Sequence, residues 1–206
     1  AGIFNLDGEP VPPIILKKMT DVLAHRGPDG EGQYINGFFG IGHRRLAIID
    51  LSPAGHQPMV SANKQFILSY NGEIYNFQEL RAELERLGHQ FHSRTDSEIV
   101  LNSWVEWGEN CVYRFNGMFA FSIWDKRTKT LFLVRDRYGI KPLYYATWGG
   151  TFLFGSEQKA ILEHPEAKSV IDKRALLEYF TFQNIFTNRT LFKNIKLLQP
   201  ASIGKL

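Results

Sequence analysis

The chain has 206 residues, of which 44% are hydrophobic and 14% aromatic, enough apolar material for one sizeable core. Its formal net charge of +3 comes from interspersed charges, so nothing favours a nucleic-acid-binding surface. No apolar stretch approaches the roughly 18 to 20 residues that span a bilayer, and the first residues do not resemble a signal peptide. Cys111 is the single cysteine, which excludes an intrachain disulfide and a cysteine-based zinc site. We therefore expect one large soluble domain, residues 1–206, in the cytoplasm.

Alternating apolar residues predict most of the secondary structure in the first half of the chain. A strand is expected at "GIFNL" (2–6), followed by a helix that opens at Pro12-Pro13 and shares one apolar face. That face comprises Ile15, Met19, Val22 and Leu23. Strands are expected next at "GFFGIGH" (37–43), "RLAIID" (45–50) and "QFILSYN" (65–71).

Two helices should follow, each opened by a capping box, in which two residues cap the helix start reciprocally. The first begins after Asn76 with Glu79 as partner, and Gly88 ends it. Its apolar side chains are Phe77, Leu80, Leu84 and Leu87. The second begins at "TDSE", where Thr95 pairs with Glu98, and Gly108 ends it. It carries Ile99, Val100 and Trp104.

The remaining strands are expected at "GMFAFSIWD" (117–125), "TLFLVRD" (130–136) and "TFLFGS" (151–156), with hairpin turns at "DKRTK" and Gly149-Gly150. A last helix should start near Asp172 and present Leu176, Leu177 and Phe180. Because helices occur in clusters among many strands, the pattern predicts an α+β fold with mainly antiparallel sheet. The final segment, "LFKNIKLLQPASIGKL", is consistent with the edge of a domain in a longer protein.

Three polar stretches are not explained by core packing. In "GHRRLAIID", Arg44 and Arg45 lie between apolar runs. They form either a surface pair at a turn or a clamp for a carboxylate, which the planar fork of arginine suits.

The second stretch is "YNGEIYN", where Asn71-Gly72 is either an ordinary turn or two donors that converge on one point. An asparagine amide beside a glycine N–H has the chemistry of an oxyanion hole.

The third is "RTDSE", where Asp96 either stabilises the positive end of a helix or receives an ammonium group. Arg45 and Asp96 would then hold the two ends of a free amino acid. The six histidines show no HExxH-like pairing, so no metal site is predicted.

Nine ordered blocks together resemble the glutamine amidotransferase domain of the asparagine synthetase family, of the class II or N-terminal-nucleophile type. The blocks are "GIF", "HRGPDG", "RLAIIDL", "GHQPM", "NGEIYN", "TDSE", "GMFAF", "RDRYGIKPLYY" and "SEQKAI", with "FGSEQKAIL" extending the last. The resemblance covers essentially the whole chain. It implies a four-layer αββα sandwich of two mainly antiparallel sheets, the N-terminal nucleophile hydrolase fold.

The resemblance also implies a function and a set of roles. Glutamine would be hydrolysed to glutamate and ammonia, and the ammonia passed to a C-terminal ATP-dependent synthetase domain. Arg45 would bind the α-carboxylate of L-glutamine, Asp96 its α-ammonium, and Asn71 with Gly72 the oxyanion. Backbone groups of Leu46, Ile48 and Glu73 would complete the contacts. No cofactor is expected in this domain. ATP and Mg are expected only in the synthetase domain, whose SGGxDS-type phosphate loop does not occur in this sequence, and the ammonia acceptor cannot be inferred.

Residue 1 departs from the family pattern. In the family this position is a cysteine whose thiol attacks the amide and whose α-amine is the base. Ala1 keeps an amine without a nucleophile, so we expect this chain to be inactive. Either a cysteine was deliberately replaced, which the intact remaining blocks favour, or a natural loss left a catalytically dead glutamine-binding or scaffold module. A purely structural interaction domain is a third alternative. Cys111 should be buried and inert, and a homo-oligomer is left open.

Overall fold

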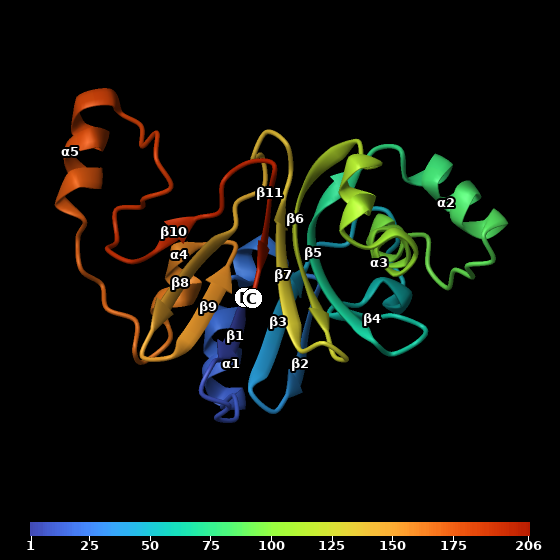
Figure 1. Cartoon of the computed structure of the whole chain (residues 1–206), viewed down its shortest axis with the longest axis horizontal. Coiled ribbons are helices and arrows are strands. Elements are labelled where there is room, and N and C mark those ends of the chain that lie inside the picture. The colour runs from blue at the N-terminus through green and yellow to red at the C-terminus, as the bar shows by residue number, and fades with distance from the viewer. The chain divides into compact units, whose positions relative to one another are not determined.

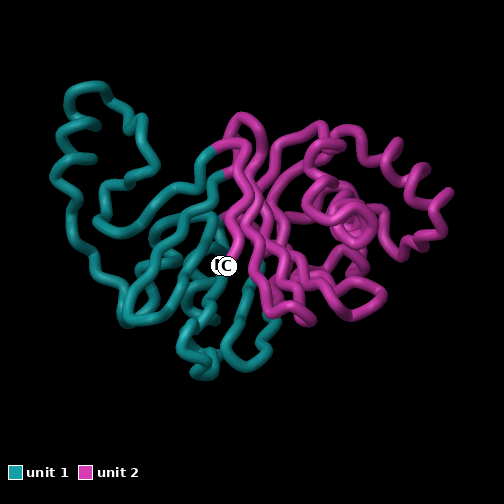
Figure 2. Tube along the Cα trace, viewed as in Figure 1, with its two compact units in different colours: residues 1–25, 33–43, 142–199 teal, residues 26–32, 44–141, 200–206 magenta.

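The computed structural model describes all 206 residues, and the chain folds into two compact units (Figure 2). Each unit collects segments that lie far apart in the sequence. Unit 1 comprises residues 1–25, 33–43 and 142–199, and unit 2 comprises residues 26–32, 44–141 and 200–206. Each unit therefore has its own sheet and helices, with β2 and β3 running from one unit into the other.

Unit 1 is built on a six-stranded sheet with the order β10-β8-β9-β1-β3-β2 (Figure 1). Its strands are β1 (Gly2–Asn5), β2 (Gly30–Asn36), β3 (Phe39–Arg45), β8 (Tyr144–Trp148), β9 (Thr151–Gly155) and β10 (Lys196–Leu197). Strand β1 is antiparallel to both neighbours, with Gly2 opposite Ile41 and Phe154. A Cβ on Gly2 would lie 2.1 Å from the Phe154 ring, so the close approach requires glycine. The first residues are thus held inside a sheet.

The helices of unit 1 are α1 (Pro13–Asp21), α4 (Gln158–Leu162) and α5 (Lys173–Phe182), with a 3-10 turn, η1, at Ala24–Arg26. Leu16 and Met19 of α1 and Ile161 of α4 share one core with Ile3 and Leu153 of the sheet. The predicted face of the first helix is confirmed for Met19 and Leu23, which are buried, and for Ile15, which is half-exposed but packs against the same core. Val22 is half-exposed, and Leu16, which was not predicted, is buried.

Unit 2 is built on a five-stranded sheet with the order β11-β7-β6-β5-β4. Its strands are β4 (Met59–Val60), β5 (Phe66–Ile74), β6 (Gly117–Asp125), β7 (Thr130–Arg135) and β11 (Ser202–Lys205). Its helices are α2 (Phe77–Arg86) and α3 (Asp96–Trp107), with 3-10 turns η2 (Pro53–Gly55) and η3 (Gly108–Tyr113). Figure 1 shows α3 beside β5, and Ile99 and Trp104 of this helix share a core with Leu68 and Phe121 of the sheet.

The predicted α+β class is confirmed, since two sheets carry helices and the neighbours of β1, β5, β6 and β8 are antiparallel to them. Both predicted hairpins form, between β6 and β7 and between β8 and β9. The strand predicted at 45–50 is wrong. Strand β3 ends at Arg45, whose guanidinium bonds to carbonyls of Asp50 and Ser52 and so bends the following chain into a loop.

The capping box at Thr95 forms in part, and the one at Asn76 does not form. Thr95 Oγ1 accepts from Glu98 N at 3.3 Å, as predicted, but the Glu98 carboxylate accepts from the amides of His92 and Ser93. Asn76 precedes α2 without capping it, because its side chain bonds to Arg114 O and Asn116 N instead. The side chains of Glu98 and Asn76 both bond to groups outside the helices that they were predicted to cap.

The last predicted helix forms as α5 and starts after Asp172, as expected. Asp172 caps it, accepting from Arg174 N at 2.9 Å and Ala175 N at 3.2 Å. Leu177 and Phe180 are nevertheless exposed, Leu176 is only half-buried, and Ala175 is the buried residue of this helix. No other helix or strand makes extensive contact with α5.

Candidate functional site

One edge of β5 presents three alternate backbone amides, those of Tyr70, Gly72 and Ile74. Tyr70 N donates to Gln57 Oε1 at 2.7 Å, and Tyr70 O accepts from Gln57 Nε2 at 3.2 Å. Ile74 N donates to Asp96 Oδ2 at 3.0 Å. Strand β4 reaches only Ile67 and Leu68, so side chains satisfy the edge beyond it. Gly72 lies between the two satisfied positions.

The amide of Gly72 points toward the same edge. Its partner across the strand pair is Phe119, whose N–H donates to Asp136 Oδ2 at 3.2 Å and whose carbonyl accepts from Asp136 N at 2.8 Å. Phe119 thus directs both backbone groups away from β5, which makes the Gly72–Phe119 pair a non-hydrogen-bonded one. A Cβ on Gly72 would lie 2.4 Å from Met118 O, so only glycine fits.

Asn71 contributes a second donor beside this amide. Its Nδ2 atom is shielded from solvent and donates to no group of the chain. A buried donor without a partner costs about 1–3 kcal/mol, and native proteins rarely keep one without a function. The chain does not turn at Asn71-Gly72, because both residues lie within strand β5. It continues to Ile74 and carries two adjacent donors, one of them unsatisfied.

Asp96 is a buried carboxylate in the first turn of α3, with 6% of its surface exposed. Its Oδ2 accepts from Tyr70 Oη at 2.6 Å and from Ile74 N. Burial raises the pKa of Asp96 above its ordinary value, against the opposing effect of those two bonds. Burial, and then the Asp96 charge, raises the pKa of Tyr70 as well. Asp96 is thereby fixed at the edge that carries Gly72.

Arg45 lies at the end of β3 and holds the loop that follows. Its Nη1 donates to Ser52 O at 2.8 Å, and its Nη2 donates to Asp50 O. A Cβ on Gly55 would lie 2.3 Å from Arg45 Nη2 and 2.8 Å from Thr95 Cγ2, which places the guanidinium near the start of α3. Arg44 differs, because it forms an ion pair with Glu31 at 2.7 Å.

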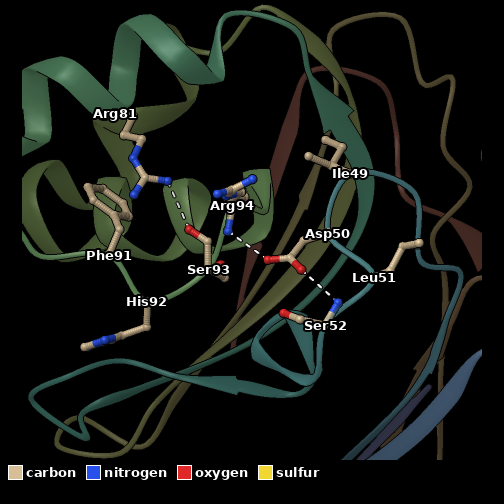
Figure 3. A pocket seen from close by; sticks show the side chains of 9 residues that line it. All are labelled: Ile49, Asp50, Leu51, Ser52, Arg81, Phe91, His92, Ser93 and Arg94. Carbon is tan, nitrogen blue, oxygen red and sulfur yellow. Dashed lines mark hydrogen bonds between the residues drawn. The ribbon is translucent and has the colours of Figure 1, made fainter.

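The loop after β3 also forms one wall of a pocket of about 520 Å³ (Figure 3). Its lining residues are Ile49, Asp50, Leu51, Ser52, Arg81, Phe91, His92, Ser93 and Arg94. Asp50 accepts from Arg94 N at 2.9 Å and Ser52 N at 2.8 Å, and these bonds lower the pKa of Asp50 to about 2. Asp50 therefore ties the loop to the segment that leads into Asp96.

The other residues that were predicted to contact glutamine have side chains that face outward. The side chains of Leu46, Ile48 and Glu73 are exposed. Backbone roles do not require these side chains to be buried, so their exposure is compatible with the roles that the resemblance assigns to them. Ala47 N donates to Asp29 Oδ2 at 2.9 Å, which anchors the loop start.

Ala1 belongs to unit 1. Its α-amino nitrogen donates to Gly42 O at 2.9 Å, and Gly42 N donates to Ala1 O at 2.8 Å. Burial lowers the pKa of this amine from 8.0 to about 5. The nitrogen is therefore a neutral amine near neutral pH, held in register by β3.

A family model described as a glutamine amidotransferase domain matches residues 1–206. The chain belongs to this family. It is 44% identical to asparagine synthetase [glutamine-hydrolyzing] 3 of Bacillus subtilis over 189 residues, covering 90% of this chain and 31% of that protein. It is 39% identical to asparagine synthetase 1 of the same organism, covering 91% of this chain and 29% of that protein. The domain thus spans about a third of the length of these relatives.

Solved structures show the same fold at lower identity. Glutamine phosphoribosylpyrophosphate amidotransferase from B. subtilis has a TM-score of 0.66 and 23% identity, covering 78% of this chain and 42% of that one. A second structure, of the allosteric regulatory enzyme of purine biosynthesis, has a TM-score of 0.67. This amidotransferase domain therefore has the N-terminal nucleophile hydrolase fold.

Within unit 2, Asp96 is bonded to the edge of β5 that carries Asn71 and Gly72, and the Arg45 guanidinium lies near Thr95, the residue before Asp96. Sequence reasoning missed two residues of this arrangement, Gln57 and Tyr70, which hold the strand edge and the carboxylate in place. Both lie in quoted blocks, "GHQPM" and the strand before "NGEIYN", but their contacts join positions 13 to 26 residues apart. No local pattern signals such contacts.

Two further observations concern the chemistry that the domain contains. Cys111 is buried, and burial raises the pKa of its thiol, which confirms its predicted burial and leaves it a poor nucleophile. No three histidine, cysteine, aspartate or glutamate side chains are grouped to hold a metal ion.

None of the helices combines the length and apolar character needed to cross a membrane.

Proposed function

We propose that this domain binds L-glutamine and that a cysteine at position 1 makes it a glutaminase. The observation that carries the proposal is the unsatisfied Nδ2 donor of Asn71 beside the edge-facing amide of Gly72. Two such donors stabilise the oxyanion that forms when the side-chain amide is attacked. One donor of this kind is worth about 3–4 kcal/mol in comparable sites.

The two charged residues would fix the amino-acid end of glutamine. A guanidinium has five N–H donors, and Arg45 uses two of them on loop carbonyls, so the others are left for the α-carboxylate. Asp96 would accept the α-ammonium group, whose charge favours the ionised carboxylate over the neutral form that burial favours. Backbone groups of Leu46, Ile48 and Glu73 would complete the contacts.

The reaction requires a nucleophile that alanine lacks. With cysteine at position 1, the neutral α-amine would take the thiol proton, and the sulfur would attack the amide carbon of glutamine. The tetrahedral oxyanion would lie against Asn71 and Gly72, the amine would return the proton to the departing ammonia, and water would hydrolyse the thioester to glutamate. The amine pKa of about 5 keeps the base unprotonated at neutral pH. With Ala1 the domain should be inactive.

The ammonia would pass to an acceptor activated by a separate ATP-dependent synthetase domain. The relatives are named asparagine synthetases, and this chain matches only 31% and 29% of their length, which leaves room for such a domain. ATP and Mg would be bound there and no cofactor here. Aspartate is the acceptor that the product asparagine implies.

Glutamate release by the Ala1→Cys chain tests the proposal, with mass spectrometry to verify the free amino terminus. The parent chain should release none, because Cys111 is buried in both. Adding Asn71→Ala to the Ala1→Cys chain should lower kcat about 10²- to 10³-fold, while Arg45→Lys should mainly raise KM. A processed Ala1→Cys chain that releases no glutamate would refute the proposed catalysis.

A second candidate function is a glutamine-binding module without chemistry, which Ala1 itself favours. Calorimetry with the parent chain should then show glutamine binding that Asp96→Ala abolishes, and the Ala1→Cys chain should remain inactive. Binding together with restored hydrolysis would instead favour the first function.

A further inference from the structure

The segment 173–187, which we name the α5 projection, exposes five large apolar side chains. They are Leu177, Tyr179, Phe180, Phe182 and Phe186, with 44% to 75% of each exposed. In Figure 1, α5 stands off from the sheet of its own unit, and Figure 2 shows the same segment extending from unit 1. Several large exposed apolar side chains gathered on one segment mark an interaction site.

The projection is held in one shape at its base and along its length. Asp172 N donates to Leu191 O at 2.9 Å and Lys193 N to Val170 O at 2.7 Å, closing the segment at its base. Beyond the helix, Phe186 N donates to Glu178 Oε1 at 2.7 Å. This bond brings the Phe186 ring to 5.7 Å from that of Phe182.

These bonds reduce, without removing, the ordering that binding requires. A ten-residue helix is marginal by itself in water, so the projection gains stability from whatever covers it.

We propose that the α5 projection is the docking surface for the ATP-dependent synthetase part of the polypeptide, an inference that rests on the proposed function. The relatives carry about two thirds of their length outside the region that this chain matches. A glutaminase that delivers ammonia to such a part must be held against it, and an exposed aromatic helix provides the contact.

A second copy of this chain is a poorer fit. The surface offers five large side chains, whereas a stable interface between separate chains takes about 20–30 residues per partner. A domain on the same polypeptide requires less area, because the connection gives it an effective concentration in the millimolar range. The size of the surface therefore favours a tethered partner.

Hydrogen exchange in a full-length protein tests the docking. Chain 1–206 would replace the matched region of B. subtilis asparagine synthetase 3, and the amides of 173–187 would be compared with those of chain 1–206 alone. We expect exchange at least about tenfold slower in the chimera, because docking suppresses local opening of the helix. Phe180→Ser with Leu177→Ser should abolish this protection, whereas Leu87→Ser, on an exposed position of unit 2, should leave it intact.

Equal exchange in the chimera and the isolated chain would overturn the proposal. So would a dimer of the isolated chain, seen by light scattering, that Phe180→Ser dissociates, because the occupant would then be a second copy. Hydrogen exchange of the α5 amides is measured independently of glutamine hydrolysis. Protected α5 amides without glutamate release from the Ala1→Cys chain would leave docking supported and refute only the proposed function, and the reverse result would refute only docking.

Discussion

Helices α3 and α5 begin alike and end in opposite environments. Each starts at a side chain that caps its first turn, Thr95 in unit 2 and Asp172 in unit 1, and each carries aromatic residues. In α3 every residue from Asp96 to Trp104 is buried, whereas in α5 only Ala175 is. The comparison shows that capping decides where a helix starts, and that the neighbouring sheet decides whether its apolar side chains become core.

The largest expected difference between the two helices concerns their aromatic residues. Trp104 is 3% exposed, and its ring lies 5.0 Å from that of Phe132 and 6.0 Å from that of Phe121. Trp104→Ala should lower the free energy of unfolding by about 3–5 kcal/mol, since it leaves a cavity. Phe180→Ala should change it by no more than about 0.5 kcal/mol. Urea denaturation measures both, and similar losses would show that α5 is packed in solution.

The next effect concerns charge in the first turn of α3. Because burial raises the pKa of Asp96, the folded state binds its proton more tightly than the unfolded state does. The contribution of Asp96 to stability is therefore greatest below its ordinary pKa of 3.8 and falls as pH rises through the raised folded pKa.

Urea denaturation over this pH range checks the sign. The stability of the parent relative to Asp96→Asn should fall with rising pH. Asp50, Asp125 and Asp136, whose pKa values are lowered, give the opposite slope but are common to both chains. A stability difference that does not change with pH would contradict the assigned cause.

The smallest effect separates the two caps. Thr95→Ala should lower the global free energy of unfolding by about 1 kcal/mol, since α3 unfolds with the core. Asp172→Ala should leave that global value unchanged and speed hydrogen exchange only in α5, because little of the domain depends on this helix. If Asp172→Ala lowered the global free energy of unfolding as much as Thr95→Ala does, the proposed difference between the two caps would be contradicted.

The residues and the family resemblance name the candidate site residues, but their geometry could not be predicted from the sequence. The local pattern left open whether Asn71-Gly72 was a turn, and only the Gly72–Phe119 pairing shows a continuing strand with an edge-facing amide. Likewise the arginine pair offered two candidates, and Arg44 is taken by Glu31 while Arg45 holds the loop. These outcomes depend on partners that are distant in sequence.

By itself the sequence determined the signals that act within a few residues: the strand periodicities, the cap at Thr95, the helix start near Asp172, the hairpin turns and the burial of a lone apolar cysteine. Tertiary structure decided which stripe of α1 is buried, that Glu98 bonds to the preceding loop, and that the aromatic residues of α5 remain exposed. The physical reason is the distance along the sequence over which each interaction acts. A cap or turn is satisfied by adjacent backbone, whereas burial and hydrogen-bond competition depend on which surfaces the whole fold brings together.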